Sequence, residues 1–136
     1  MLTRFVPRVL GAVLLSLAVL VTGCSSESGG AAADVSASVP AWAHGMATVE
    51  VGRLPEEARR TLRRIDDGGP YPYAKDGTVF SNFERELPRR KRGYYHEYTV
   101  RTPGERDRGA RRIVTGDGGE FYYTDDHYAS FKAVLR

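Results

Sequence analysis

The sequence is poor in the side chains that usually build metal centres and covalent cross-links. Its 136 residues include one cysteine, three histidines and two methionines. A single cysteine cannot form an intramolecular disulfide. The sequence also lacks a paired metal-ligand motif, a glycine-rich phosphate-binding loop and a serine-nucleophile elbow. These absences argue against a zinc enzyme, a P-loop nucleotidase and a serine hydrolase, and we expect neither a metal nor a cofactor.

Long hydrophobic runs are scarce as well, and the one near the N-terminus is short. Residues 9–21 are apolar and uncharged, and they follow Arg4 and Arg8. Crossing a bilayer comfortably takes about 20 apolar residues. A basic start, a short apolar core and small residues after it are typical of a secretory signal. We therefore predict a signal peptide over residues 1–23, with an uncleaved anchor helix as the alternative.

The segment from Val21 to Cys24, with sequence VTGC, resembles the lipobox of bacterial lipoproteins. The resemblance implies cleavage before Cys24 and lipid attachment to that residue, and several acyl chains hold a protein stably at a membrane. The competing interpretation is a plain signal peptide that leaves a free thiol. Residues 24–45 are predicted to be a flexible tether, and residues 46–136 one folded domain. We expect an exported protein, either a lipoprotein on the outer face of the envelope or a secreted protein.

The charge of the chain is small but unevenly distributed. The formal net charge is +3, and ten basic against four acidic side chains lie between Arg85 and Arg112. A positive net charge mildly favours an anionic binding partner but does not indicate which one. The densest cluster is Arg-Arg-Lys-Arg at 89–92, for which a merely solvated loop is an equally good interpretation.

Residue patterns in the domain predict one helix followed by strands. Pro55 and the acidic residues after it favour a helix start, Ala58, Leu62 and Ile65 form one apolar stripe, and Gly-Gly-Pro at 68–70 ends the helix. Strands are predicted at 94–100, 111–115, 120–124 and 128–135, with another beginning at 79–80. This order predicts the α+β class, with one N-terminal helix packed on a twisted antiparallel β-sheet.

Few side chains of this domain are suited to acid–base chemistry. Alternation along strand 94–100 places His96 and Glu97 on opposite faces, so they cannot act as a pair. A carboxylate within an aromatic strand is costly to bury unless something pairs with it. Arg108 and Arg112 share one face if their segment is extended, and the planar fork of arginine suits phosphate. The acid and the arginines predict either a phosphate site or a structural Glu–Arg pair on the sheet surface.

Several blocks of sequence occur in the order found in one enzyme family. The three longest are 94–104 (YYHEYTVRTPG), 108–116 (RGARRIVTG) and 122–129 (YYTDDHYA), and shorter ones lie at 54–56, 69–73 and 76–80. Together they resemble the secreted guanyl-specific ribonucleases of the barnase and ribonuclease Sa type. The resemblance covers residues 54–131, which is nearly the whole domain.

The resemblance implies an endoribonuclease that cleaves single-stranded RNA on the 3′ side of guanosine. It implies Glu97 as general base, His127 as general acid, and Arg108 and Arg112 as ligands of the phosphate. The first step would form a 2′,3′-cyclic phosphate and the second would hydrolyse it to a 3′-phosphate. The two arginines would supply the positive charge, so no metal is required, and DNA would not react because it lacks the 2′-hydroxyl.

The resemblance also implies a set of guanine-binding residues: Phe80, Ser81, Asn82, Phe83, Glu84 and Tyr128. Glu84 would accept both N–H donors on the Watson–Crick edge of guanine, whereas adenine would leave it unsatisfied. Asn82 would shape the loop, and Phe80 and Tyr128 would stack on the base, although Phe80 is an equally good core residue. Relatives of this type usually carry a disulfide, which this chain cannot form, and Phe83 replaces a polar or basic residue.

The family implies single-stranded RNA as substrate and a barstar-like protein inhibitor as partner. We expect a monomer that does not bind DNA and that is held at the membrane through a lipid on Cys24. The alternative from another class is a catalytically silent, envelope-anchored module of the same fold that binds RNA or a protein. An antibacterial toxin with the same chemistry is a third interpretation.

Overall fold

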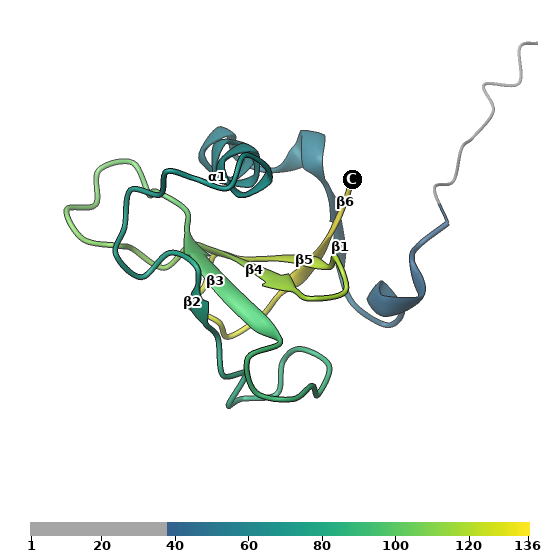
Figure 1. Cartoon of the computed structure of the whole chain (residues 1–136). Helices are drawn as coiled ribbons and strands as arrows, with labels where there is room; N and C mark the ends of the chain where they lie inside the picture. The colour runs from purple at the N-terminus through teal and green to yellow at the C-terminus, as the bar shows by residue number, and fades with distance from the viewer. Residues whose placement is uncertain (1–37) are drawn as a thin grey trace, which may run out of the picture. The chain divides into compact units, whose positions relative to one another are not determined.

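The computed structural model describes residues 38–136, which contain one α-helix, two 3₁₀ turns and six strands (Figure 1). In chain order these are η1 (Ala41–Ala43), β1 (Thr48–Glu50), η2 (Val51–Arg53), α1 (Glu56–Asp66), β2 (Thr78–Val79), β3 (Tyr95–Thr99), β4 (Arg112–Gly116), β5 (Phe121–Thr124) and β6 (Lys132–Leu135). The signal peptide predicted at 1–23 and the lipid site predicted at Cys24 lie outside the described residues. Within the described part, no helix has the length and apolar character needed to cross a membrane.

The six strands form one sheet in the order β1-β6-β5-β4-β3-β2, and α1 lies across one of its faces (Figure 1). Four of the five neighbouring pairs are antiparallel, and β1 pairs with β6 in parallel. The predicted α+β class is therefore confirmed, with a sheet that is mixed rather than purely antiparallel. Strand β1 was not predicted, because three residues are too few to show an alternating pattern.

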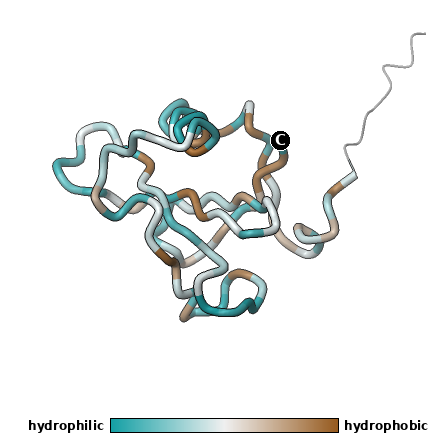
Figure 2. The backbone as a smooth tube through the Cα atoms, in the orientation of Figure 1, coloured by the Kyte–Doolittle hydropathy of each residue, from teal (hydrophilic) through white to brown (hydrophobic). Residues whose placement is uncertain are grey.

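The helix packs on the sheet through its predicted stripe. Ala58 and Leu62 are buried, and Ile65 packs against the same cluster. Figure 2 shows the apolar side of the helix directed toward the sheet. Burying one leucine side chain stabilises a fold by roughly 2 kcal/mol. The helix begins at Glu56, and Pro55 is the capping residue rather than the first helical one.

The opposite face of the sheet carries a second hydrophobic cluster. Ile113 and Tyr123 belong to the cluster beneath α1, whereas Val114 and Tyr122 belong to the other one, because side chains alternate along a strand. Ala43 is fully buried in this second cluster. Residues 38–45, which we expected to belong to the tether, therefore include a residue of the core.

The strand predicted at 128–135 begins only at Lys132. His127 and Tyr128 have backbone φ angles of 56° and 70°, which lie in the left-handed region and are incompatible with a strand. Residues 125–131 consequently form a loop at the end of β5. This loop brings His127 and Tyr128 to the face of the sheet opposite α1.

Candidate active site

The candidate site lies on the face of the sheet that α1 does not cover. Alternation along β3 places Tyr95, Glu97 and Thr99 on one face, and Tyr95 belongs to the cluster opposite the helix. Glu97 is paired with Val114 of the same cluster across the sheet. The sheet register therefore fixes the carboxylate of Glu97 at the edge of an aromatic core.

Two fixed contacts compensate the burial of Glu97, whose side chain is only 12% exposed. Arg108 donates from Nη2 to Oε1 of Glu97 at 2.9 Å, and from Nε to the hydroxyl of Thr99 at 3.0 Å. The hydroxyl of Tyr128 donates to Oε2 of Glu97 at 2.7 Å. Charge-assisted bonds of this kind offset the desolvation of a carboxylate. Arg108 reaches the site from the loop before β4 and does not extend that strand.

Arg112, the first residue of β4, is the most deeply buried cation of the site, with 2% exposure. Its Nη1 donates to the backbone carbonyls of Arg108, Gly109 and Arg111, and its Nε donates to the hydroxyl of Tyr128 at 3.0 Å. Within residues 38–136 no carboxylate forms an ion pair with it. A buried guanidinium held only by neutral groups keeps its positive charge available for an anion.

Tyr128 connects the carboxylate to the buried cation. Its hydroxyl donates to Glu97 and accepts from Arg112. Burial raises the pKa of this hydroxyl, and the hydrogen bond to Glu97 raises it further, so Tyr128 remains a proton donor near neutral pH. From the sequence we expected Tyr128 only to stack on the base, because no sequence pattern indicates where a tyrosine hydroxyl will point.

His127 borders the other side of the cluster. Its exposed ring lies 5.0 Å from the ring of Tyr128, and it lines a shallow depression together with Arg108 and Arg112. Its backbone N–H donates to the carbonyl of Ala110 at 3.1 Å. The structure thus brings Glu97, Arg108 and Arg112 into one network and sets His127 beside it.

The loop that carries His127 and Tyr128 is braced from within. Asp126 accepts hydrogen bonds from the hydroxyl and the N–H of Ser130 and from the hydroxyl of Thr124. The hydroxyl oxygen of Thr124 in turn accepts from the N–H of Tyr128 at 3.2 Å. Left-handed backbone costs roughly 1–2 kcal/mol for each residue that is not glycine. The brace offsets that cost and holds two consecutive strained residues in place.

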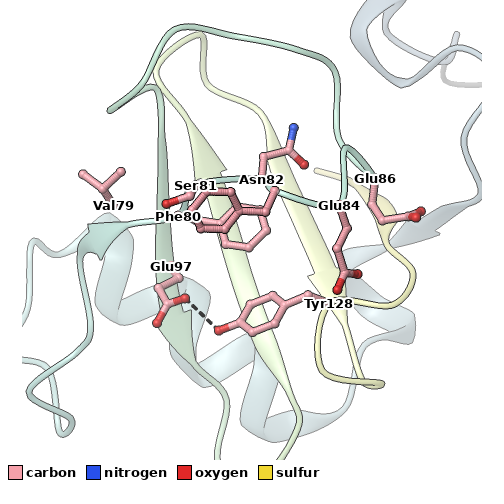
Figure 3. A pocket seen from close by; sticks show the side chains of 9 residues that line it. Val79, Phe80, Ser81, Asn82, Glu84, Glu86, Glu97 and Tyr128 are labelled. Atoms are coloured by element: carbon pink, nitrogen blue, oxygen red, sulfur yellow. Dashed lines mark hydrogen bonds between the residues drawn. The ribbon is translucent and has the colours of Figure 1, made fainter.

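A pocket of about 270 Å³ opens beside Glu97 and Tyr128. Figure 3 shows these two side chains joined at one side of the opening and Glu84 reaching in from the opposite side. The pocket is lined by all six residues that we predicted to bind a base, together with Val79, Glu86 and Glu97, which were not in that set. Its wall opposite the sheet is the loop that follows β2.

Asn82 shapes this loop. Its backbone is left-handed, with φ of 52°, a conformation that asparagine tolerates better than most residues. Its side-chain amide donates to the carbonyl of Leu87 and accepts from the N–H of the same residue, at 2.8 and 3.1 Å. Both ends of the amide are therefore occupied by the loop itself, and the side chain points away from the pocket (Figure 3).

The two rings expected to stack on a base stack on each other. The centroids of Phe80 and Tyr128 are 5.1 Å apart with an interplanar angle of 23°, which leaves no room for a base between them. Phe80 also contacts Phe131 of the core, so it is both a core residue and a pocket wall. Phe83 is 90% exposed at the rim of the pocket.

Comparison with known proteins finds ribonucleases of similar sequence and structure. A family model described as ribonuclease matches residues 37–135. The chain is 57% identical over 91 residues to guanyl-specific ribonuclease St of Saccharopolyspora erythraea, covering 67% of this chain and 90% of that one. It is 56% identical over 88 residues to guanyl-specific ribonuclease Sa of Kitasatospora aureofaciens, covering 64% and 92%. A solved structure of ribonuclease Sa2 in complexes with mononucleotides matches with a TM-score of 0.66 and 52% identity, covering 67% of this chain and 95% of that one.

Proposed function

The chain belongs to the microbial guanyl-specific ribonuclease family, and from that premise we propose that it cleaves single-stranded RNA on the 3′ side of guanosine. The observation that carries the proposal is that the pocket of about 270 Å³ and the hydrogen-bonded cluster of charged side chains share one residue, Glu97. Glu97 is at once a wall of the pocket and the acceptor of hydrogen bonds from Arg108 and Tyr128. A base in the pocket would place its own ribose and 3′-phosphate against these groups.

In the first step, Glu97 takes the proton of the ribose 2′-hydroxyl as that oxygen attacks the adjacent phosphorus. A bond forms between phosphorus and the 2′-oxygen, and the bond from phosphorus to the 5′-oxygen of the next nucleotide breaks. Protonated His127 gives its proton to that departing oxygen. Arg108 and Arg112 stabilise the charge that grows on the phosphate oxygens, and general acid–base help contributes typically about 10²–10⁴-fold.

The products are a guanosine 2′,3′-cyclic phosphate end and a free 5′-hydroxyl. Hydrolysis reverses the roles: His127 takes a proton from water as the water oxygen bonds to phosphorus, the bond from phosphorus to the 2′-oxygen breaks, and Glu97 returns a proton to that 2′-oxygen. The product is a 3′-phosphate. This chemistry requires the ribose 2′-hydroxyl, so DNA is not a substrate.

Base selection is assigned to Glu84, whose carboxylate would accept the two N–H groups on the edge of guanine. Adenine lacks that pair of donors, and a carboxylate left unsatisfied by the wrong base gives strong discrimination. Because Phe80 and Tyr128 stack on each other, the base would stack on the outer surface of this pair rather than between the rings. Asn82 contributes by holding the loop.

Cleavage-site mapping on an RNA of defined sequence tests the proposal. We expect cuts after each guanosine, with cyclic phosphate ends appearing before 3′-phosphate ends. An otherwise identical RNA with 2′-deoxyguanosine at one position should escape cleavage only there. Uniform cutting after all four bases would contradict the base assignment, and cleavage at the deoxynucleotide would contradict the mechanism.

Matched variants assign the roles. Glu97→Gln and His127→Ala should each lower kcat by at least about 100-fold, with folding unchanged by circular dichroism. Since Glu97 must be ionised and His127 protonated, the rate of the wild type should fall on both sides of an optimum pH. If the purified protein binds guanosine-containing RNA but never cleaves it, the silent binding module is the correct interpretation.

We also propose export with lipid attachment at Cys24, on the strength of the N-terminal sequence alone. The wild type should fractionate with membranes and incorporate labelled fatty acid. Cys24→Ser should abolish the label and release the protein from membranes. A wild type that takes up no label would refute lipidation while leaving export intact.

A further inference from the structure

The pocket beside Glu97 and Tyr128, which is proposed to hold guanine, is called the guanine pocket below. A second pocket, of about 410 Å³, lies on the other side of the loop that forms its wall. The two pockets share residues 80–83, so the loop is a thin partition between them. The second pocket is also lined by Tyr95 and by five basic side chains: Arg85, Arg89, Arg90, Lys91 and Arg92. We call it the basic pocket. Figure 2 shows the corresponding stretch as strongly hydrophilic.

The five cations of the basic pocket are exposed, and none forms an ion pair within the described part of the chain. On α1, by contrast, Arg59 and Arg63 both pair with Glu56. The acidic neighbours Glu84 and Glu86 line the guanine pocket and not the basic one. The basic pocket therefore gathers five cations that form no ion pair within residues 38–136.

Backbone and aromatic contacts hold the segment 88–95, which carries four of the five cations, in a defined conformation. The hydroxyl of Tyr95 donates to the carbonyl of Pro88 at 2.6 Å, and the N–H of Tyr94 donates to the carbonyl of Lys91. The guanidinium of Arg90 lies 5.2 Å from the centroid of the Tyr94 ring. A cation cluster on a braced loop loses less entropy on binding an anion than one on a free loop, which favours a binding site over a merely solvated segment.

The order of the sites gives a direction for the RNA strand. In the proposed mechanism His127 protonates the 5′-oxygen of the following nucleotide. The RNA on the 3′ side of the guanosine would therefore lie along the depression lined by His127 and Arg108. The basic pocket lies at the other end, beyond the guanine pocket. We propose that the basic pocket holds phosphates of the RNA chain on the 5′ side of the guanosine, which rests on the function proposed above.

Phe83 fits the same role at the partition. Its ring is 90% exposed and lines both pockets, and an exposed aromatic ring beside cations is the usual platform for single-stranded nucleic acid. The base of the nucleotide that precedes the guanosine would stack on Phe83 while its phosphate meets the arginines.

Paired substrates provide the test. The dinucleotide GpU has nothing on the 5′ side, whereas UpUpGpU extends the chain there and GpUpUpU extends it on the 3′ side. The test variant replaces residues 89–92 by four glutamines. We expect kcat/KM of this variant to be unchanged on GpU and GpUpUpU, and to fall about tenfold on UpUpGpU, the effect of two exposed charge contacts.

A charge-matched control separates a local site from general attraction. The control variant replaces four basic residues outside the basic pocket by glutamine: Arg53, Arg60, Arg101 and Lys132. It loses the same number of charges as the 89–92 variant, and its kcat/KM on all three substrates should equal that of the wild type. For the wild type, raising the salt concentration should lower the affinity for UpUpGpU more steeply than the affinity for GpU. In a plot of the logarithm of the binding constant against the logarithm of the salt concentration, the two slopes should differ by about 0.7 for each phosphate that the basic pocket holds. Phe83→Ala should lower the advantage of UpUpGpU over its analogue with an abasic first and second nucleotide.

A binding assay keeps this inference distinct from the proposed function. In UpUpGpU, replacing the guanosine and both leading uridines by their 2′-deoxy forms removes every hydroxyl that could attack a phosphate. This analogue cannot be cleaved, so its affinity can be measured whether or not the protein is an enzyme. If the wild type leaves GpU uncleaved but binds this analogue more tightly than the 89–92 variant does, the proposed function fails and the basic pocket stands. Equal binding by both proteins overturns the inference.

Two other results would also overturn it. A loss by the 89–92 variant on GpUpUpU and not on UpUpGpU would place the pocket on the 3′ side. If the variant cleaves and binds every RNA as the wild type does, but loses binding to vesicles of anionic phospholipid, the basic pocket is a membrane contact instead.

Discussion

Replacing Tyr128 by phenylalanine removes one oxygen atom from the centre of the site and keeps the ring. That oxygen donates to Glu97 at 2.7 Å and accepts from Arg112 at 3.0 Å. A hydrogen bond to a charged group contributes about 1.5–3 kcal/mol net. Water can replace part of this at a half-buried site, so we expect a total loss of about 2–3 kcal/mol in the free energy of unfolding. For a domain of this size, each kcal/mol lowers Tm by about 4–8 °C.

The same substitution should separate kcat from KM. Glu97 would keep only its contact with Arg108, so the carboxylate would be less well aimed at the 2′-hydroxyl, and kcat should fall about 10–100-fold. The pocket wall formed by the ring remains, so KM for GpU should change less than about threefold, a difference under 0.7 kcal/mol. Steady-state kinetics on GpU and thermal unfolding followed by circular dichroism measure both quantities.

Tyr123→Phe is the matched control, because Tyr123 lies in the cluster beneath α1 on the opposite face of the sheet. It should leave kcat and KM as in the wild type. If Tyr128→Phe lowers Tm but leaves kcat unchanged, the hydroxyl is structural only. If KM rises while kcat holds, Tyr128 acts on the base and not on Glu97.

Three further substitutions test other parts of the structure. Asn82→Ala removes both bonds to Leu87 and should raise KM at least about tenfold, measured on GpU, with kcat less affected; an unchanged KM would mean that the loop holds its shape without the amide. Leu62→Ala should destabilise the fold by about 2–5 kcal/mol, measured by urea unfolding, with activity retained below the transition; a loss under 1 kcal/mol would contradict its place in the core. Hydrogen bonds from Ser130 lower the pKa of Asp126 to about 2, below the value of about 3.9 expected in the unfolded chain. Asp126 therefore stabilises the fold above about pH 4, and this contribution is lost as the pH falls through 2; Asp126→Asn should flatten urea-unfolding stability over that window, and an unaltered pH dependence would contradict the brace.

Local sequence patterns were sufficient to predict the helix and the strands that bury one continuous stripe or face. The spacing of Ala58, Leu62 and Ile65 predicted α1, and the aromatic run predicted β3 within one residue at each end. Such patterns work because burial of one face depends on spacing along the chain alone. The same logic failed for 128–131, where left-handed backbone at Tyr128 overrides an alternation that looks like a strand.

The candidate residues could be named from the sequence through the family resemblance, but their connections could not. Glu97 and Arg108 are 11 residues apart, and Glu97 and Tyr128 are 31 apart. No local sequence pattern predicts that the hydroxyl of Tyr128 will contact both Glu97 and Arg112. That contact exists because the register of β3 on β4 and the braced loop after β5 bring three segments to one point.

The amino-acid sequence by itself determined the helix, most of the strands, the uneven basic charge and the residue types available for acid–base chemistry, since each follows from spacing or composition. Only the tertiary structure decided that β1 pairs in parallel with β6, that Phe80 and Tyr128 stack on each other, and that cations at 89–92 line one pocket together with residues 80–83. These features depend on contacts between distant segments. Such contacts are fixed by packing of the whole sheet and not by any local pattern.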